Sequence, residues 1–224
     1  MILGPSSLPT IYRIARSAAQ RIFRMSHSLD DWWVRRAVAK AAGRRCIGIP
    51  TYTSPSELAV LYKLAVSTPS GSTAVEIGSH LGASACFLAA GLREVNGVLY
   101  CVDTWNNDAM GSEPTIDTYA TFTDNIKDLV DIIRPVRMNS AHISREDLPK
   151  SLELVFIDGD HEYSAAAKDV EVTAWRVRPG GVMVFHDSVG TTGVGRAIGE
   201  LLATGNWVLA GQVHLTTWLR RVPN

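Results

Sequence analysis

Apolar residues in this chain fall into two alternating patterns. Short, predominantly apolar runs recur at 74–77, 98–102, 132–138, 154–157 and 182–185. The segments between these runs place apolar residues three and four positions apart, which is the spacing of an α-helix. Apolar strands that alternate with helices are typical of a parallel sheet covered on both faces. The pattern therefore predicts an α/β fold with a doubly wound, mostly parallel sheet.

The end of the chain shows a different pattern. Two further apolar runs, at 207–210 and 213–219, flank Gly211-Gln212. Runs separated by a short glycine-containing turn predict an antiparallel hairpin. Together with the five earlier strands, this hairpin gives a seven-stranded, Rossmann-like sheet with antiparallel pairing at one edge.

Helices are expected between the strands and before them. The first is clearly signalled, because Ser54 suits the N-cap, Pro55 the first helical position and Glu57 the capping box. The expected helices of the main domain cover about 55–66, 83–94, 115–129, 162–177 and 192–203. The stripe expected to pack the fourth of these on the core is Tyr163, Ala167, Val170 and Ala174.

The N-terminal part differs from the rest in charge. Residues 1–45 hold nine basic and two acidic side chains, a net charge of +7, whereas the remainder holds 13 basic and 20 acidic side chains, a net charge of −7. Helices are predicted over 9–26 and 28–42, with a linker over 43–53. We predict two parts, a basic helical extension over 1–50 and a main domain over 51–224.

The helix predicted over 9–26 is amphipathic and basic. Such a helix can lie on an anionic membrane or pack against protein. Its apolar face consists mostly of Ala and Ile and has no Trp or Leu anchor. This favours packing on the domain or on a second copy of the chain, with peripheral membrane contact through residues 1–45 as the alternative.

Composition excludes several classes of protein. No apolar run approaches the roughly 18 residues of a membrane span, and the N-terminus has no signal-peptide core. The three cysteines, Cys46, Cys86 and Cys101, form no CxxC pair, which indicates reduced thiols in a cytoplasmic protein. The acidic main domain would repel phosphates, so nucleic acid is not an expected partner.

A glycine loop follows the first predicted strand. Glu76 is followed by Gly78 and Gly82, and a helix begins directly afterwards. Glycines let the backbone approach a ligand, and open α/β sheets bind ligands at the carboxyl ends of their strands. The second strand ends in Asp103, whose carboxylate can bind ribose hydroxyls.

The spacing of this loop discriminates between ligands. NAD-binding folds carry G-x-G-x-x-G, which seats a pyrophosphate and is absent here. An acidic residue before the loop suits a cationic ligand such as S-adenosylmethionine (SAM), which has an ammonium, a sulfonium and no phosphate. The alternative is an ordinary turn with acidic surface groups, and the glycines alone would favour it.

Polar groups also follow the fourth and fifth predicted strands. Asp158 comes directly after one strand and His186-Asp187-Ser188 after the next. Adjacent parallel strands bring such residues to one edge of the sheet. Carboxylates there can bind Mg²⁺, which would orient a hydroxyl and favour its deprotonation. The alternative is that both aspartates cap turns or helices.

These motifs together resemble those of class I SAM-dependent methyltransferases. The matching residues are Glu76-x-Gly78-x-x-x-Gly82, Asp103, Asp158-Gly159-Asp160-His161 and Pro179-Gly180-Gly181. The pattern is most similar to the branch of catechol, caffeoyl-CoA and macrocin-type O-methyltransferases, and it covers about residues 54–220.

The resemblance implies positions for SAM. Glu76 and Gly78 would hold its methionine end, Asp103 its ribose, and Trp105 with Asn139-Ser140 would lie near its adenine. The other residues expected to bind SAM are Ser79, Gly82, Ser84, Thr104 and Asp158.

The resemblance also implies catalytic groups. The metal set would be Asp158, Asp187 and Ser188, where Ser188 replaces an asparagine of the relatives and weakens the case for Mg²⁺. His161 takes the place of their lysine base, and histidine is a credible base because its pKa lies near neutrality. We therefore expect His161, Asp158 and Asp187 to be catalytic, with Asp187 or His186 as alternative bases.

The resulting hypothesis is an O-methyltransferase that moves a methyl group from SAM to a hydroxyl of a sugar, polyketide or phenol, with Mg²⁺ assistance as an option. A loop over 104–114 would help to enclose the substrate. Two alternatives share the fold, a non-catalytic SAM- or nucleotide-binding module and a hydroxylase-like relative. His80, His142 and His214 cluster with nothing in the sequence and are assigned no role.

Overall fold

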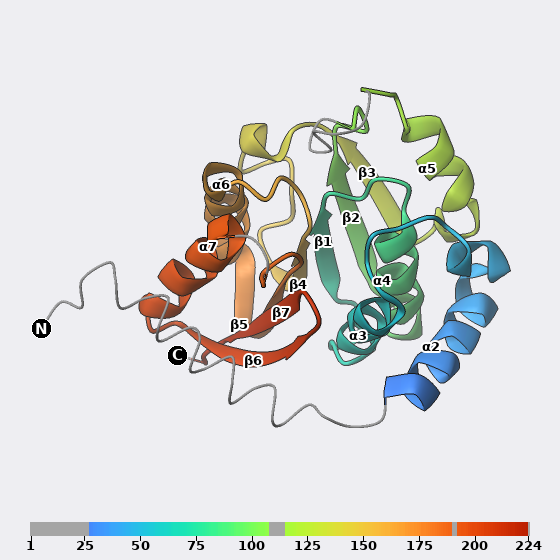
Figure 1. The fold of residues 1–224 in the computed structure, drawn as a ribbon, viewed down its shortest axis with the longest axis horizontal. Coiled ribbons are helices and arrows are strands. Elements are labelled where there is room, and N and C mark those ends of the chain that lie inside the picture. The colour runs from blue at the N-terminus through green and yellow to red at the C-terminus, as the bar shows by residue number, and fades with distance from the viewer. Residues whose placement is uncertain (1–26, 108–114, 190–191, 224) are drawn as a thin grey trace, which may run out of the picture.

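Seven strands form one sheet in the order β3-β2-β1-β4-β5-β7-β6 (Figure 1). The computed structural model describes residues 27–107, 115–189 and 192–223. The strands are β1 (Thr73–Ile77), β2 (Val98–Asp103), β3 (Ile133–Arg137), β4 (Leu152–Ile157), β5 (Val177–Phe185), β6 (Trp207–Val213) and β7 (Thr216–Arg221).

The pairing of the strands brings the predicted motifs to one edge. Strands β1 to β5 are parallel, with β1 between β2 and β4, so that Glu76 lies opposite Cys101 on one side and Phe156 on the other. Strand β7 runs antiparallel to β5, and β6 antiparallel to β7. The predicted mostly parallel, seven-stranded sheet with an antiparallel pair at one edge is confirmed.

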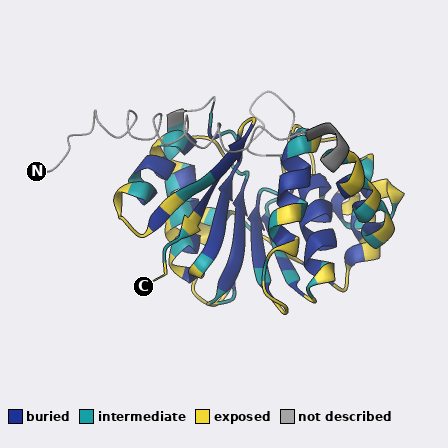
Figure 2. Ribbon diagram, turned by 90° about the horizontal axis from the view of Figure 1, so that it is seen from below, coloured by how far each residue is buried: buried dark blue, intermediate teal, exposed yellow. Residues whose placement is uncertain are grey.

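Helices cover both faces of the sheet, whose strands are largely buried between them (Figure 2). The packing pairs α3 with α4 on one face and α6 with α7 on the other. The helices are α2 (His27–Ala42), α3 (Pro55–Val66), α4 (Ala83–Glu94), α5 (Tyr119–Asn125), α6 (Tyr163–Thr173) and α7 (Thr192–Ala203), with short 3₁₀ turns η1 (Arg44–Ile47), η2 (Lys127–Leu129), η3 (Ser140–His142) and η4 (Ala174–Arg176).

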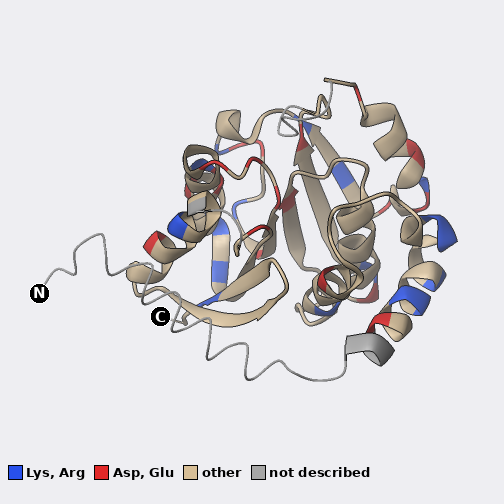
Figure 3. Ribbon diagram, viewed as in Figure 1, with Lys and Arg blue, Asp and Glu red and all other residues tan. Residues whose placement is uncertain are grey.

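Helix α2 packs outside α3 and α4 and carries basic side chains in its C-terminal half (Figure 3). Its buried residues Val34 and Val38 belong to the same apolar core as α3 and α4. The helix predicted over 9–26 lies outside the described residues. Within the described part of the chain, no helix is both long and apolar enough to cross a membrane.

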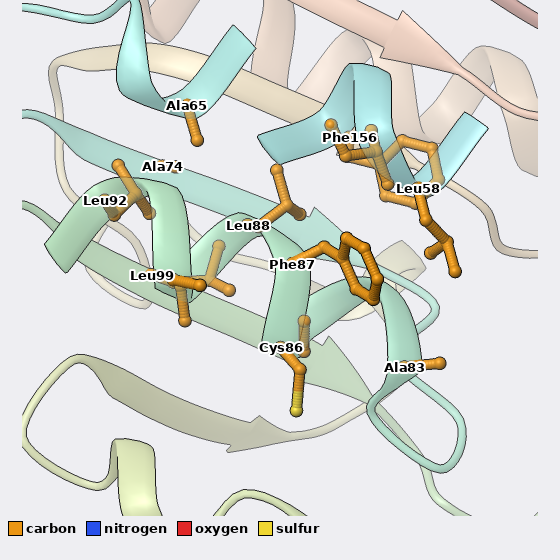
Figure 4. Close-up of a cluster of buried hydrophobic side chains, with 14 of the residues drawn as sticks. Leu58, Ala65, Ala74, Ala83, Cys86, Phe87, Leu88, Leu92, Leu99 and Phe156 are labelled. Carbon is orange, nitrogen blue, oxygen red and sulfur yellow. The ribbon is translucent and has the colours of Figure 1, made fainter. Parts of the chain in front are cut away.

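The larger core lies between the sheet and helices α3 and α4 (Figure 4). Phe87 and Leu88 of α4, Leu58 of α3 and Phe156 of β4 are buried there. The two helices approach closely at Gly91, where an added Cβ would lie 2.7 Å from the Tyr62 carbonyl oxygen. Cys46, Cys86 and Cys101 are buried, and none of them forms a disulfide.

The C-terminal hairpin turns later than predicted. Its strands are joined at His214-Leu215 and not at Gly211-Gln212. Gly211 lies within β6, at a register shift, and the Trp218 ring fills the space that a Cβ would need, with ring atoms 2.2–2.8 Å from it. The glycine therefore makes room for packing across the strand pair. In the sequence, such a glycine cannot be told from a glycine that forms a turn.

Two helical predictions also need correction. Helix α5 begins at Tyr119, later than the predicted 115, and gives way to a 3₁₀ turn. Helix α6 ends at Thr173, and its buried residues are Ala166, Asp169, Val172 and Thr173. The predicted stripe of Tyr163, Ala167, Val170 and Ala174 is only partly buried, because α6 is rotated so that a carboxylate faces inward.

Candidate active site

One cavity of about 960 Å³ opens at the carboxyl edge of the sheet. A cavity of this size can hold a nucleoside-sized ligand together with a small second molecule. Each parallel strand contributes to it through the segment that follows, and the contributing residues include Gly78, Asp103, Asn139, Asp158 and Asp187. The cavity therefore lies where the strand order predicts a ligand site.

The glycine loop after β1 is held against its neighbours. Gly78 has φ 86°, and a Cβ on it would lie 2.1 Å from the Asp158 carbonyl oxygen, so only glycine fits. Asp103 Oδ2 accepts hydrogen bonds from the backbone N–H groups of Ser79 and His80, both at 2.8 Å. The carboxylate expected to bind ribose thus also fixes the loop, and it still lines the cavity.

Glu76 lies beneath this loop and is fully buried. Its Oε2 accepts a hydrogen bond from the Ser79 hydroxyl at 2.6 Å, whereas Oε1 has no hydrogen-bond partner among the described residues. Burial raises the pKa of the Glu76 carboxyl to about 7, against hydrogen bonds from Ser79, Ser84 and Cys101 that lower it. An unpartnered buried oxygen at this point suits a cationic ligand above it, although Glu76 itself does not line the cavity.

The residues predicted to lie near the adenine of SAM are only partly where they were expected. Asn139 and Ser140 line the cavity, and Asn139 caps η3 by accepting a hydrogen bond from the Ala141 N–H. Trp105 needs correction, because it is fully buried, packs against Phe122 and donates from Nε1 to the His80 carbonyl oxygen. It supports the loop from behind and does not face the cavity.

The remaining predicted SAM-binding residues divide in the same way. Ser79, Ser84 and Thr104 line the cavity. Gly82 does not, because its Cα faces Phe122 and Ile126. Of the predicted lid over 104–114, Thr104 and Asn107 line the cavity, and residues 108–114 lie outside the described part of the chain.

Two aspartates and a histidine meet at the other end of the cavity. One carboxylate oxygen each of Asp158 and Asp187 and one ring nitrogen of His161, atoms of the kind that coordinate metal ions, lie within 4.8 Å of one another. His161 Nε2 is 2.9 Å from Asp187 Oδ2, and the His161 side chain is 44% exposed to the cavity mouth. Asp187 has φ 46°, a strained conformation for a residue other than glycine and a common mark of functional sites.

Charge pairing shifts the protonation of this cluster. The hydrogen bond to Asp187 raises the pKa of the His161 imidazole above its ordinary value. Contacts with His161 and His186 lower the pKa of the Asp187 carboxyl. The pair therefore forms a carboxylate–imidazole dyad, in which the carboxylate orients the ring and stabilises its protonated form.

His186 lies behind the dyad and is buried. Its Nδ1 is 3.1 Å from Asp158 Oδ1 and 3.2 Å from Asp187 Oδ2, and its Nε2 is 3.7 Å from Glu57 Oε1. Burial alone would lower the pKa of His186, but the three carboxylates outweigh it and raise the pKa to about 12. An imidazolium thus sits among Glu57, Asp158 and Asp187.

These features coincide with a known family. The chain matches the methyltransferase-domain family over residues 75–188, which is about half of its length. The chain belongs to this family. Together with the sheet order and the cavity, the match makes it a class I SAM-dependent methyltransferase, as the motifs predicted.

Solved structures share the fold of this methyltransferase at low sequence identity. The O-methyltransferase NovP superposes with a TM-score of 0.69 at 12% identity, covering 87% of this chain and all of that one. An O-methyltransferase from Bacillus cereus in complex with SAH gives 0.55 at 16% identity, covering 95% and 100%. CalS11, a TDP-rhamnose 3′-O-methyltransferase, gives 0.53 at 14% identity, covering 89% and 97%.

The predicted metal set of the methyltransferase needs correction at Ser188. The Ser188 hydroxyl is buried, donates to the Leu215 carbonyl oxygen at 2.7 Å and lies 2.8 Å from Thr217 Oγ1. It points away from Asp158 and Asp187 and does not line the cavity. His161, predicted as a base, stands beside the two aspartates in its place.

Sequence reasoning missed two buried carboxylates of the site. The sequence pattern marks Glu57 only as a helix-capping residue and gives Asp169 no role within its helix. Asp169 lines the cavity, and burial raises its pKa to about 6 against a hydrogen bond from Ser140. No signal in the sequence marks Asp169, because its burial depends on the rotation of α6, whose buried residues are not those of the predicted stripe.

Proposed function

We propose that this methyltransferase transfers the methyl group to a hydroxyl oxygen of a small molecule, a sugar, polyketide or phenol. The observation that carries the proposal is the His161–Asp187 dyad, which opens into the same cavity as the glycine loop. Oxygen methylation of a hydroxyl requires removal of one proton, and the dyad is a base suited to that task.

The residues present fit SAM. The glycine loop and Asp103 would hold its methionine and ribose parts, and Asn139 and Ser140 would border the adenine. The unpartnered Glu76 oxygen beneath the loop complements a positive charge above it. When bound, SAM supplies an electrophilic methyl group on a sulfonium, which becomes a neutral thioether as the new C–O bond forms.

The dyad manages the proton. In the neutral His161 ring, Nε2–H donates to Asp187 Oδ2, so Nδ1 carries the lone pair that accepts a proton. As the acceptor oxygen bonds to the methyl carbon, its proton passes to Nδ1. The imidazolium that results faces an ionised Asp187, whose charge stabilises it.

The acceptor end of the cavity is bounded by the segment before α3 and by the hairpin turn. Thr51 and Tyr52 line it on one side, and Leu215 on the other. The backbone joins Leu215 to the active-site loop, because the Ser188 N–H donates to its carbonyl oxygen at 2.9 Å. This mixed polar and apolar boundary supports an acceptor with a ring and hydroxyl groups.

The donor set does not fit Mg²⁺ well. This ion prefers an oxygen-only octahedral shell, whereas here the two carboxylates contact two histidines and the expected third ligand, Ser188, faces elsewhere. The proposed proton transfer therefore uses His161 and Asp187 without a metal ion.

Incubation with methyl-labelled SAM and a panel of small sugars, polyketides and phenols tests the proposal. Transfer of label to oxygen, identified by mass spectrometry and NMR, is the expected result. SAM binding without any labelled product would instead support the non-catalytic module, and label on nitrogen or carbon would contradict O-methylation.

A further inference from the structure

His186 occupies the position between the two active-site aspartates. One ring nitrogen, Nδ1, lies at nearly equal distances from Asp158 and Asp187, 3.1 and 3.2 Å. Neither ring nitrogen makes an aligned hydrogen bond to any described residue. Nδ1 therefore lies between the two carboxylates, where an ion shared by both would lie.

Glu57 anchors the far side of this ring. Its Oε1 accepts hydrogen bonds from the Leu215 N–H at 2.8 Å and the Thr216 hydroxyl at 3.0 Å, and its Oε2 from the Ser54 N–H at 2.9 Å. Glu57 is 2% exposed, and burial would raise its pKa, but the ion pair with His186 and the hydrogen bonds with Ser54 lower that pKa to about 2. A fixed, ionised carboxylate thus sets the position of His186.

The groups around the ring leave little room for a second cation. The charged or titratable groups that act on the ring are Glu57 from α3, Asp158 after β4 and Asp187 after β5. His161 at the cavity mouth also interacts with it. A divalent ion bound by the same two aspartate oxygens would lie at about 2.0–2.1 Å from each, and the His186 ring already occupies one side of this oxygen pair. An ion on that side would collide with Nδ1, and an ion on the other side would have to share both carboxylates with the His186 ring.

We propose that the His186 imidazole, anchored by Glu57, takes the place of a divalent metal ion and holds Asp158 and Asp187 in position for methyl transfer. His186 and Glu57 are thus positioning residues, which act through the aspartates. The link to methyl transfer rests on the proposed function, whereas the absence of metal binding can be measured without it.

A cation titration tests the proposal. The full-length protein with bound S-adenosylhomocysteine is titrated with MnCl₂ and MgCl₂ in a calorimeter, and Mn²⁺ binding is followed by electron paramagnetic resonance. We expect no binding to wild type up to about 1 mM, the weak end of protein cation sites. Tighter binding to wild type that is lost in Asp187→Asn would overturn the proposal.

The variant His186→Asp supplies the complementary result. It replaces the cation by a third oxygen ligand, so Mn²⁺ affinity should rise at least about tenfold over wild type. The matched control is His142→Asp, the same change at an exposed histidine outside the cluster, which should bind no more than wild type. A folded His186→Asp protein with wild-type cation affinity would contradict the exchange of imidazole for metal.

Activity separates this inference from the proposed function. Methyl transfer by wild type should be unchanged by EDTA. Loss of transfer on chelation with recovery on added Mg²⁺ would overturn the metal-free arrangement and keep the O-methyltransferase proposal. If no acceptor is methylated, the proposed function fails, while the titration still decides the role of His186.

Discussion

His161 is the single residue on which proton removal depends. It lines the cavity and is oriented by Asp187 at 2.9 Å. His161→Ala should lower the rate of methyl transfer about 10²–10⁴-fold and leave the affinity for SAM nearly intact, because a general base contributes to the chemical step. Single-turnover kinetics and calorimetry measure the two quantities. Near-normal turnover of the variant at pH 7 would remove His161 as the base and direct attention to Asp187.

The same dyad predicts a pH dependence. The base must be neutral, and the hydrogen bond to Asp187 raises the pKa of His161 above its ordinary 6.5. Methyl transfer should therefore rise with pH through a midpoint above 6.5. In Asp187→Asn the raising contact is lost, so the midpoint should move to lower pH, with a lower plateau because the ring is less well oriented. A kcat–pH profile with the same midpoint in both proteins would refute this coupling.

Residues that follow strands could be assigned to the site from the sequence, and residues from elsewhere could not. Asp158, His161 and Asp187 were expected together because parallel strands carry them to one edge, and they do meet. Glu57 reaches His186 only through the packing of α3 against the sheet, which no local pattern encodes. Trp105 and Ser188 were placed by resemblance, and their side chains turn inward.

Among the elements, the glycine loop depends on Asp103. The carboxylate holds the Ser79 and His80 N–H groups and has a remaining lone pair for a ribose hydroxyl. Asp103→Ala should weaken binding of SAM and S-adenosylhomocysteine by about 1–3 kcal/mol, the cost of leaving such groups unpaired. Calorimetry checks this against Asp131→Ala, which removes an exposed carboxylate paired with Arg93. Equal affinities in the two variants would exclude a role for Asp103 in binding.

The α3–α4 contact depends on a glycine in the same way. In Gly91→Ala the new Cβ would lie 2.7 Å from the Tyr62 oxygen and from the Ala65 Cβ, so the helices must move apart. We expect a loss of stability of about 1–3 kcal/mol by thermal or urea unfolding. Gly195→Ala in α7 is the control, because its Cβ meets only the Ser188 oxygen at 3.5 Å. Because alanine has a higher helix propensity than glycine, Gly195→Ala should be as stable as wild type or more stable. An equal loss of stability in Gly91→Ala and Gly195→Ala would contradict this account.

The sequence predicts helices and strands best where the apolar periodicity is strong. It predicts them worst at glycines, because a glycine can mark a turn or make room for a neighbouring side chain. The helix at α3 begins as its capping residues indicate, and five parallel strands lie where apolar runs predict. Gly211 resembled a turn glycine but makes room for Trp218. Pro179-Gly180-Gly181 precedes the strand predicted over 182–185 but lies within β5, where a register shift absorbs the irregular backbone.

At the scale of the whole molecule, charge is unevenly distributed along the chain: a basic N-terminal side, residues 1–45, precedes an acidic remainder. Figure 3 shows the basic residues of α2. The described part of this basic side presents two exposed tryptophans on α2, Trp32 at 53% and Trp33 at 61% exposure. Arg36 lies over the Trp32 ring, 5.8 Å from its centroid. Tryptophan beside basic residues is typical of segments that lie at a membrane interface.

This surface favours an anionic membrane over a second copy of the chain as the partner of residues 1–45. A twofold symmetric dimer centred on the C-terminal half of α2 would place the same basic patch against itself, and like charges would oppose it. An anionic membrane complements the patch, at about 1 kcal/mol for each basic residue near the surface. The basic residues of α2 and η1 are Arg35, Arg36, Lys40, Arg44 and Arg45.

We therefore predict that the full chain sediments with vesicles that contain phosphatidylserine, less so at high salt, and not with neutral vesicles. Trp32→Ser combined with Trp33→Ser should reduce binding, because the interfacial anchors are lost. Trp175→Ser is the matched control, since Trp175 is 47% exposed and also contacts arginines, Arg145 and Arg176, but lies on η4. If the tryptophan pair instead changes the sedimentation coefficient without lipid, and vesicle binding is absent, the surface joins two copies of the chain.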